Sequence, residues 1–268
     1  MTLSIPILHI PSHSPITLSI SMIICFSMTF FAFYKRILDI KGALAALALG
    51  LIISIFSDIY WLMALVGLLV LTSLVTRVRF NYKRQHGLAE GKIGERGINN
   101  VIAVGFIPGF IALFSYHLDN VHPGLAGLLF LVSLSIAAAD TFASEVGVLS
   151  DRAILITSFK RVAPGTDGGI SLLGEMSAVL GAFFVSLIGF VFVTDLYFSG
   201  AGHGLAADPV VLVICIAIGW IGCQLDSIMG ALFQVSRDLL SNEMVNFLTI
   251  SICVLLTWVA VGFGLLPV

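Results

Sequence analysis

The sequence predicts an all-α, polytopic membrane protein with about eight transmembrane helices in one bundle. Of its 268 residues, 59% are hydrophobic and 10% are charged, whereas soluble chains are roughly 45–50% apolar. Apolar segments long enough to span a bilayer recur along the whole chain, and the basic residues gather in alternate connections between them. These observations together exclude a soluble globular domain and favour an integral membrane protein.

Eight segments satisfy the length of about 17–25 apolar residues that one span requires. They cover residues 16–34, 42–57, 60–76, 101–116, 124–148, 171–194, 209–230 and 245–266. The second and third are short and are joined at Ser57-Asp58-Ile59, which predicts a tight helical hairpin. Residues 1–15 lack the basic start of a cleavable signal peptide. We therefore expect a short extracytoplasmic segment there, within a single transmembrane domain covering residues 1–268.

The distribution of charge predicts the orientation. All 13 lysines and arginines lie in alternate connections, at residues 35–41, 77–96, 152–161 and 237. By the positive-inside rule these connections are cytoplasmic and both termini lie outside, as in a protein of a prokaryotic plasma membrane. The bilayer, and not nucleic acid, is the expected surrounding partner. We interpret the stretch from Arg77 to Arg96 as a solvated face that mainly sets the orientation.

Acidic residues inside apolar segments are the strongest functional signal. Asp140 and Glu145 lie in the fifth segment and Asp226 in the seventh, although an ionised acid in hydrocarbon costs roughly 2.5–3.5 kcal/mol. Counted from the start of their helices, both aspartates lie about 24–25 Å from the outer surface, at the level where Asn246 begins the eighth segment. Oxygen ligands at one depth favour a cation such as Mg²⁺. The alternative is a structural pair of Glu145 with Arg152.

The four cysteines lie inside apolar segments and only His86 lies in a basic loop. We therefore expect small buried thiols and no zinc site, so that any metal is held by oxygen atoms.

A second motif follows the fifth segment. Lys160 and Arg161 precede a glycine-rich turn that leads into the next helix, and cations with backbone amides at a helix start can bind phosphate. The turn and the helix start contain Gly165, Thr166, Asp167, Gly168, Gly169 and Ser171. Two alternatives remain: the cations only hold the loop inside, and the turn is an ordinary one in which Asp167 or Ser171 caps the helix.

Four runs of sequence resemble a known family. They are Ala139-Asp-Thr-Phe-Ala-Ser-Glu-Val-Gly-Val-Leu-Ser150, Thr157-Ser-Phe-Lys-Arg-Val-Ala-Pro-Gly-Thr-Asp-Gly-Gly-Ile-Ser-Leu-Leu-Gly174, Leu225-Asp-Ser-Ile-Met-Gly-Ala231 and Val245-Asn-Phe-Leu248. Over roughly residues 40–266 the chain resembles the integral membrane family that contains plant phytyl-phosphate kinase. That family is distantly similar to CTP-dependent phytol and dolichol kinases and to CDP-diacylglycerol synthases. The chain departs from the family at Val104, where relatives tend to have a polar residue, and in its short connection over residues 231–244.

The resemblance implies an enzyme that transfers a phosphoryl group from CTP, with Mg²⁺, to an isoprenoid monophosphate such as phytyl or geranylgeranyl phosphate. We expect Asp140 and Asp226 to hold Mg²⁺ at the cytoplasmic face with help from Glu145. The phosphates of CTP would be bound by Lys160, Arg161, the 165–169 turn, Ser171 and Asn246. A cytidylyltransferase that makes a CDP-lipid would use the same triphosphate and metal, and a transporter would instead use the acids to couple ions.

Overall fold

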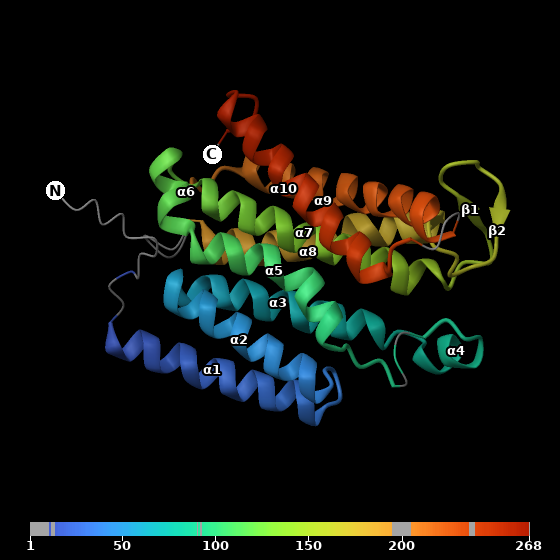
Figure 1. Ribbon diagram of the computed structural model, residues 1–268, viewed down its shortest axis with the longest axis horizontal. Helices are drawn as coiled ribbons and strands as arrows, with labels where there is room; N and C mark the ends of the chain where they lie inside the picture. Colours follow the sequence, from blue (N-terminus) through green and yellow to red (C-terminus); the bar gives the residue numbers. More distant parts are fainter. Residues whose placement is uncertain are drawn as a thin grey trace.

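The computed structural model describes residue 11 and residues 14–89, 91, 93–194, 205–235 and 239–267. Within them, long helices lie side by side along the longest axis of the molecule (Figure 1). The helices are α1 (Pro15–Tyr34), α2 (Ile40–Phe56), α3 (Ile59–Thr76), α4 (Phe80–Gln85), α5 (Ile98–Leu113), α6 (Ser115–Val121), α7 (Leu125–Gly147), α8 (Leu172–Val193), α9 (Pro209–Met229), the π-helix η1 (Gly230–Val235) and α10 (Asn242–Gly262). Each of the eight predicted segments corresponds to one of the longer helices.

Among the described residues, six helices are long and apolar enough to cross a membrane: α1, α3, α7, α8, α9 (continued to Gln234) and α10. The pair α5 and α6 is bent by 64° and makes a seventh if both form one broken span. Helix α2 is apolar but has 17 residues, one fewer than α3, the shortest of the six. The transmembrane bundle is thus confirmed, and the number of eight spans stays a prediction.

Side-chain caps explain where several helices begin. The hydroxyl of Ser171 accepts a hydrogen bond from the Gly174 amide at 3.1 Å, as predicted for one of the two candidate caps of α8. A carboxylate oxygen of Asp58 accepts from the Tyr60 amide at 3.1 Å and starts α3 directly after α2. Both caps satisfy amides that a helix start leaves without a partner. The predicted hairpin is confirmed, because α2 and α3 are joined by only two residues and contact each other.

Helix α7 is the centre of the bundle. Its apolar stretch is 83% buried, and α3, α5, α6, α8, α9 and α10 all contact it. Glycines of the neighbouring helices permit this close packing: a Cβ atom at Gly181 would lie 2.7 Å from the Ala138 carbonyl oxygen, and one at Gly219 would lie 2.2 Å from the Ser135 hydroxyl. Small residues drive such contacts between membrane helices, where no water remains to be expelled.

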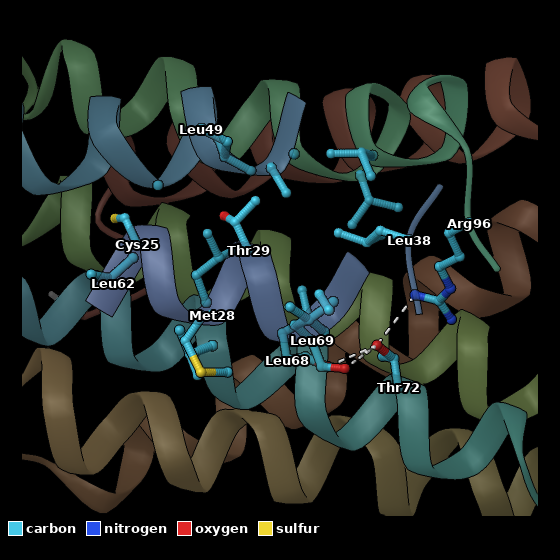
Figure 2. A pocket seen from close by; sticks show the side chains of 18 of the residues that line it. Cys25, Met28, Thr29, Leu38, Leu49, Leu62, Leu68, Leu69, Thr72 and Arg96 are labelled. Atoms are coloured by element: carbon cyan, nitrogen blue, oxygen red, sulfur yellow. Dashed lines mark hydrogen bonds between the residues drawn. The ribbon is translucent and has the colours of Figure 1, made fainter. Parts of the chain in front are cut away.

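Helices α1, α2, α3 and α5 form the second half of the bundle and enclose an apolar cavity of about 100 Å³ (Figure 2). Helix α1 contacts α2 and α3 and is only 17% buried over its apolar stretch. It exposes Ile16, Ile23, Phe26 and Phe30. Helix α1 therefore lies at the edge of the bundle, where these side chains can face lipid.

One small sheet departs from the all-α prediction. Strands β1 (Ala153–Leu155), β2 (Arg161–Val162) and β3 (Gly169–Ile170) pair antiparallel in the order β2-β1-β3. They lie between α7 and α8, at the end of the bundle where α4 also lies (Figure 1). Strand β3 contains the last glycine of the predicted phosphate turn, so this sheet fixes how that turn meets the helices.

The basic connections meet at that same end of the bundle, which we call the basic end. The Arg77 guanidinium donates to the Lys35 carbonyl oxygen at 2.8 Å, and α4 lies at the same end of the bundle as β2, which contains Arg161 (Figure 1). Helix α1 begins, and α10 finishes, at the opposite end. Among the described residues the predicted clustering of positive charge is present in three dimensions, whereas Lys92 and Arg237 lie outside them. The assignment of the basic end to the cytoplasm stays a prediction.

Candidate functional site

A polar cavity of about 170 Å³ opens at the basic end, between α7, the sheet and its connecting turn, α8, and the junction of α9 with η1. We call it the acidic cavity because its lining includes four carboxylates, from Asp140, Asp167, Glu175 and Asp226. Other lining residues are Ser144, Gly147, Gly165, Thr166, Gly168, Gly169, Ser171, Gly174, Cys223, Ser227 and Gln234. Most of the predicted site residues therefore surround one space.

The two intramembrane aspartates lie where α7 and α9 approach the basic end. Asp140 and Asp226 line the acidic cavity and also a second space of about 10 Å³, together with Asn246 and Thr249 of α10. Asp226 and Asn246 are each 9% exposed. The Asn246 carbonyl oxygen is buried and has no hydrogen-bond partner among the described residues, although a buried polar atom without a partner is costly. This oxygen therefore points to a missing ligand.

These residues fit a magnesium ion for which the protein supplies some ligands and the substrate supplies the others. Within the described residues no three His, Cys, Asp or Glu side chains form a metal-binding group. A Mg²⁺ ion does not require one, because it typically uses one or two carboxylates, substrate phosphates and water. Asp140 and Asp226 supply the two carboxylates, and Asn246 can supply a neutral oxygen. The cavity of about 10 Å³ between them is close to the minimum that holds one water-sized species.

The glycine-rich turn covers one side of the acidic cavity. Gly165 and Gly168 have φ values of +82° and +71°, a left-handed conformation that favours glycine. A Cβ atom at Gly168 would lie 2.6 Å from the Ser227 carbonyl oxygen and 2.5 Å from the Ala231 Cβ. Only a residue without a side chain lets the turn lie this close to the helix that carries Asp226.

The donors of this turn are only partly available to a ligand. The Thr166 and Gly169 amides donate to the Ala163 and Thr166 carbonyl oxygens, at 3.2 Å and 2.8 Å, so they stabilise the turn itself. Partial burial raises the pKa of the Asp167 carboxyl above its ordinary value, because the cavity solvates the ionised form poorly.

Ser171 has a positional role. Its hydroxyl caps α8 and donates to the Gly147 carbonyl oxygen at 3.3 Å. A Cβ atom at Gly147 would lie 3.2 Å from the Gly174 Cα. Ser171 thus joins the ends of α7 and α8 at the floor of the turn.

Lys160 and Arg161 lie apart from this cavity. Both are exposed, next to and at the start of β2, and neither contributes to its lining. A phosphate inside the cavity is therefore not in contact with them in this conformation. Their predicted role in phosphate binding would require the β1–β2 hairpin to move towards the cavity, or the ligand to extend out of it.

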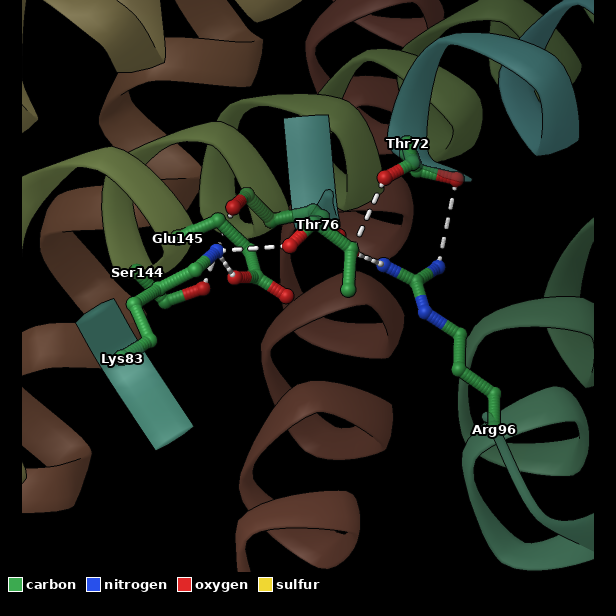
Figure 3. Close-up of polar contacts among 7 residues, drawn as sticks. Thr72, Thr76, Lys83, Arg96, Ser144 and Glu145 are labelled. Carbon is green, nitrogen blue, oxygen red and sulfur yellow. Dashed lines mark hydrogen bonds and ion pairs between the residues drawn. The ribbon is translucent and has the colours of Figure 1, made fainter. Parts of the chain in front are cut away.

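Glu145 faces away from the cavity and forms an ion pair with Lys83 of α4 (Figure 3). Five residues separate Glu145 from Asp140, which turns the side chain about 140° around the helix. The Lys83 ammonium also donates to the Thr76 carbonyl oxygen at 2.7 Å. The structure thus gives Glu145 the structural pairing that was the alternative, with Lys83 in place of the exposed Arg152. The interpretation of residues 77–96 as a solvated face is wrong for Lys83, which is 0% exposed.

Glu175 was missed by sequence reasoning. It lies in the first turn of α8, lines the acidic cavity, and one carboxylate oxygen accepts from Trp220 Nε1 at 2.8 Å and from Gln224 Nε2 at 2.7 Å. The signal was present, because Glu175 is an acid inside an apolar segment like Asp140. Gln234 was also missed, and it lies in η1, a type of helix that often occurs at functional sites.

Comparison with known proteins agrees with this architecture. The family described as integral membrane protein DUF92 matches residues 23–254. An uncharacterized membrane protein of Methanocaldococcus jannaschii is 32% identical over 235 residues, which are 87% of this chain and 90% of the relative. Protein VTE6, chloroplastic, of Arabidopsis thaliana is 30% identical over 189 residues, 68% of this chain and 53% of the plant protein.

Two other relatives match shorter stretches. An uncharacterized membrane protein of Synechocystis is 29% identical over 175 residues, 65% of this chain and 63% of the relative. Protein PGR of Arabidopsis thaliana is 32% identical over 145 residues, 45% of this chain and 50% of that protein. No solved structure matches the chain. The family match covers most of the sequence and every helix that lines the acidic cavity except the last turns of α10, so this chain belongs to the DUF92 family of integral membrane proteins.

Proposed function

We propose that the protein is a membrane-embedded phosphotransferase that moves a phosphoryl group from CTP, with Mg²⁺, to an isoprenoid monophosphate and forms the diphosphate. One observation supports this above the others: two carboxylates of α7 and α9 and a glycine turn line the same cavity at the basic end. Carboxylates with nearby backbone amides suit a metal-bound triphosphate. The acceptor class follows from the resemblance to the family that contains plant phytyl-phosphate kinase.

The residues of the cavity would act mainly by positioning charge. Asp140 and Asp226 would hold Mg²⁺, with the Asn246 carbonyl oxygen as a neutral ligand, and the ion would supply neutralisation of the triphosphate. Glu175 is oriented by Trp220 and Gln224 at the cavity wall and would exclude an anion from that side. Phosphoryl transfer depends chiefly on positioning and electrostatic stabilisation, which this arrangement can supply.

The bonds of the proposed reaction balance without a strong base. An oxygen of the acceptor phosphate forms a bond to the γ-phosphorus of CTP, and the bond from that phosphorus to the β-phosphate oxygen breaks. CDP leaves with the electron pair. Because the attacking oxygen is already ionised at neutral pH, no residue needs to remove a proton from it.

Two other functions would use similar residues. In a cytidylyltransferase the acceptor oxygen would attack the α-phosphorus and release diphosphate. In a transporter the acids would lie near the middle of the bilayer beside broken helices. Asp140 lies seven residues before the end of α7, and Asp226 lies eight residues before Gln234, where the span that begins with α9 ends, so both lie towards one end of the bundle. Their position favours an enzyme at the membrane surface.

The decisive experiment is product analysis. Purified protein in nanodiscs is incubated with Mg²⁺, phytyl phosphate and each of the four common nucleoside triphosphates. Phytyl diphosphate together with CDP, formed from CTP and lost on chelation of the metal, is the expected result. A CDP-lipid together with diphosphate would identify a cytidylyltransferase, and no product with any triphosphate or with shorter prenyl phosphates would overturn the proposal.

A further inference from the structure

The apolar cavity between α1, α2, α3 and α5 is separate from the acidic cavity (Figure 2). Side chains such as Met28, Leu49, Leu65 and Leu69 form its wall. Three polar lining residues lie nearest the basic end, namely Thr72 of α3, Arg96 just before α5 and Asn100 in the first turn of α5, while Thr29 of α1 lies further along the cavity. Figure 2 shows Thr72 and Arg96 together at one end, away from Cys25 and Leu62. The cavity is therefore amphipathic along its length.

Arg96 is fixed in place at that end. Its guanidinium nitrogens Nη1 and Nη2 donate to the Thr72 and Thr76 hydroxyls, at 3.2 Å and 3.5 Å (Figure 3). Its backbone is also held, because its amide donates to the Ile37 carbonyl oxygen at 2.9 Å and its own carbonyl oxygen accepts from the Asp39 amide at 3.1 Å. A cation is thus held in a defined position where the apolar wall ends.

The apolar cavity adjoins the metal-binding residues. Val104 of α5 lines the apolar cavity and also the small space that contains Asp140, Asp226 and Asn246. Val104 therefore lies between the two spaces. An anionic headgroup near Arg96 would lie on the same side of the bundle as the proposed triphosphate.

We propose that this cavity binds the first part of the hydrocarbon chain of a single-chain lipid whose anionic phosphate pairs with Arg96, and that the rest of the chain passes α1 into the bilayer. A guanidinium recognises phosphate through two parallel hydrogen bonds, and the apolar wall gains free energy with every methylene group that it covers. The outer wall is α1, the least buried of the candidate spans, so a lipid tail can exchange with the bilayer when that one helix moves. The identification of the lipid as the acceptor rests on the proposed function, whereas the binding site does not.

The first test narrows the cavity and measures binding without nucleotide. Met28→Trp adds volume from α1, and Ile23→Trp is the matched control on the same helix at a side chain that is 65% exposed. Calorimetry in nanodiscs with phytyl phosphate and with the five-carbon isopentenyl phosphate is the measurement. We expect Met28→Trp to weaken the binding of phytyl phosphate about tenfold and to leave the binding of isopentenyl phosphate unchanged. The control variant should bind both ligands as the wild-type protein does. Thr29→Leu, a smaller change in the same wall, replaces Met28→Trp if that variant does not fold.

The second test separates charge from shape at Arg96. Arg96→Gln should weaken the binding of phytyl phosphate about tenfold, as the loss of a charge-assisted contact to phosphate predicts. It should leave the binding of phytol unchanged. Arg96→Lys should recover part of the loss. A purely structural role of Arg96 would affect phytol and phytyl phosphate equally.

The outcomes separate this inference from the proposed function. Wild-type affinity for phytyl phosphate in Met28→Trp and Thr29→Leu, or an equal loss in Ile23→Trp, would overturn the inference even in an active enzyme. Selective loss of the long-chain ligand would support it, even in a protein that transfers no phosphoryl group from any nucleotide.

Discussion

The two halves of the bundle solve different packing problems. Around α7, α8 and α9 the helices approach closely through glycines and enclose a space lined by four carboxylates. Around α1, α2, α3 and α5 the packing is looser towards the edge, and the enclosed space is lined almost wholly by apolar side chains. One half is suited to ions and phosphates, and the other to hydrocarbon.

For the proposed reaction, the boundary between these halves matters more than either cavity alone. Helix α5 lies between them, and Val104 lines a space on each side. Lys83 and Arg96 come from the connection between α3 and α5, and both bond to Thr76 (Figure 3). A lipid phosphate and a nucleotide could meet only near this boundary.

The largest expected effect is at the aspartates. Asp140→Asn and Asp226→Asn should each lower turnover by about 10²–10³-fold or more, because the loss of one group that stabilises transition-state charge has that size. Steady-state product formation at several Mg²⁺ concentrations is the measurement. Asp58→Asn is the matched control, since asparagine also caps a helix and Asp58 lies at the start of α3, outside both cavities. Near-normal turnover in both variants would remove the proposed metal site.

The next effect concerns stability at the boundary. Lys83→Met or Glu145→Leu should each destabilise the protein by about 3–5 kcal/mol, because each leaves one buried charge without its partner. The double variant Lys83→Met/Glu145→Leu should recover most of that loss. Melting in detergent measures all three, with exposed Lys160→Met as the control. Equal destabilisation in single and double variants would show that the ion pair does not hold α4 against α7.

Much of the fold follows directly from the sequence. Apolar composition and length place the eight apolar helices, and Ser171 was one of the two predicted caps of α8. The depth of Asp140, Asp226 and Asn246 brings them together because each is counted along a straight helix of known rise. These inferences succeed where one helix determines the answer.

The rest depends on contacts between segments that no local pattern specifies. Glu145 was placed at the metal because it shares a helix with Asp140, yet α4 supplies a cation on the other side. Lys83 belongs to a basic stretch that resembles a surface, and only the tertiary structure shows that it is buried. Glu175 could have been recognised as an acid inside an apolar segment, but its hydrogen bonds to Trp220 and Gln224 join two helices and no local pattern predicts them.

A smaller effect is expected at the β1–β2 hairpin. Lys160→Gln and Arg161→Gln should each lower CTP affinity by no more than about fivefold, because an exposed ionic contact contributes about 0.2–1 kcal/mol. Equilibrium CTP binding is the measurement, and Arg152→Gln, exposed before β1, is the control. A loss of tenfold or more, confined to Lys160 or Arg161, would show that the hairpin closes over the nucleotide.

The smallest effect should come from Asp167, and its sign can be worked out. Partial burial raises the pKa of this carboxyl, so its ionised form is disfavoured in the folded protein, and folding loses stability as pH rises above the ordinary carboxyl value near 4. Without metal, Asp167→Asn should therefore melt slightly above the wild-type protein at pH 7, with a difference that vanishes as pH falls towards 4. With Mg²⁺ and CTP present the order should reverse at pH 7, because the wild-type carboxylate then faces a cation, and acidification should restore the first order as protons compete with the ion. Melting curves across this range, with Asp208→Asn at the exposed start of α9 as the control, decide it. A wild-type protein that is the more stable one at pH 7 without metal would mean that Asp167 is stabilised within the fold itself and is not held ready for a cation.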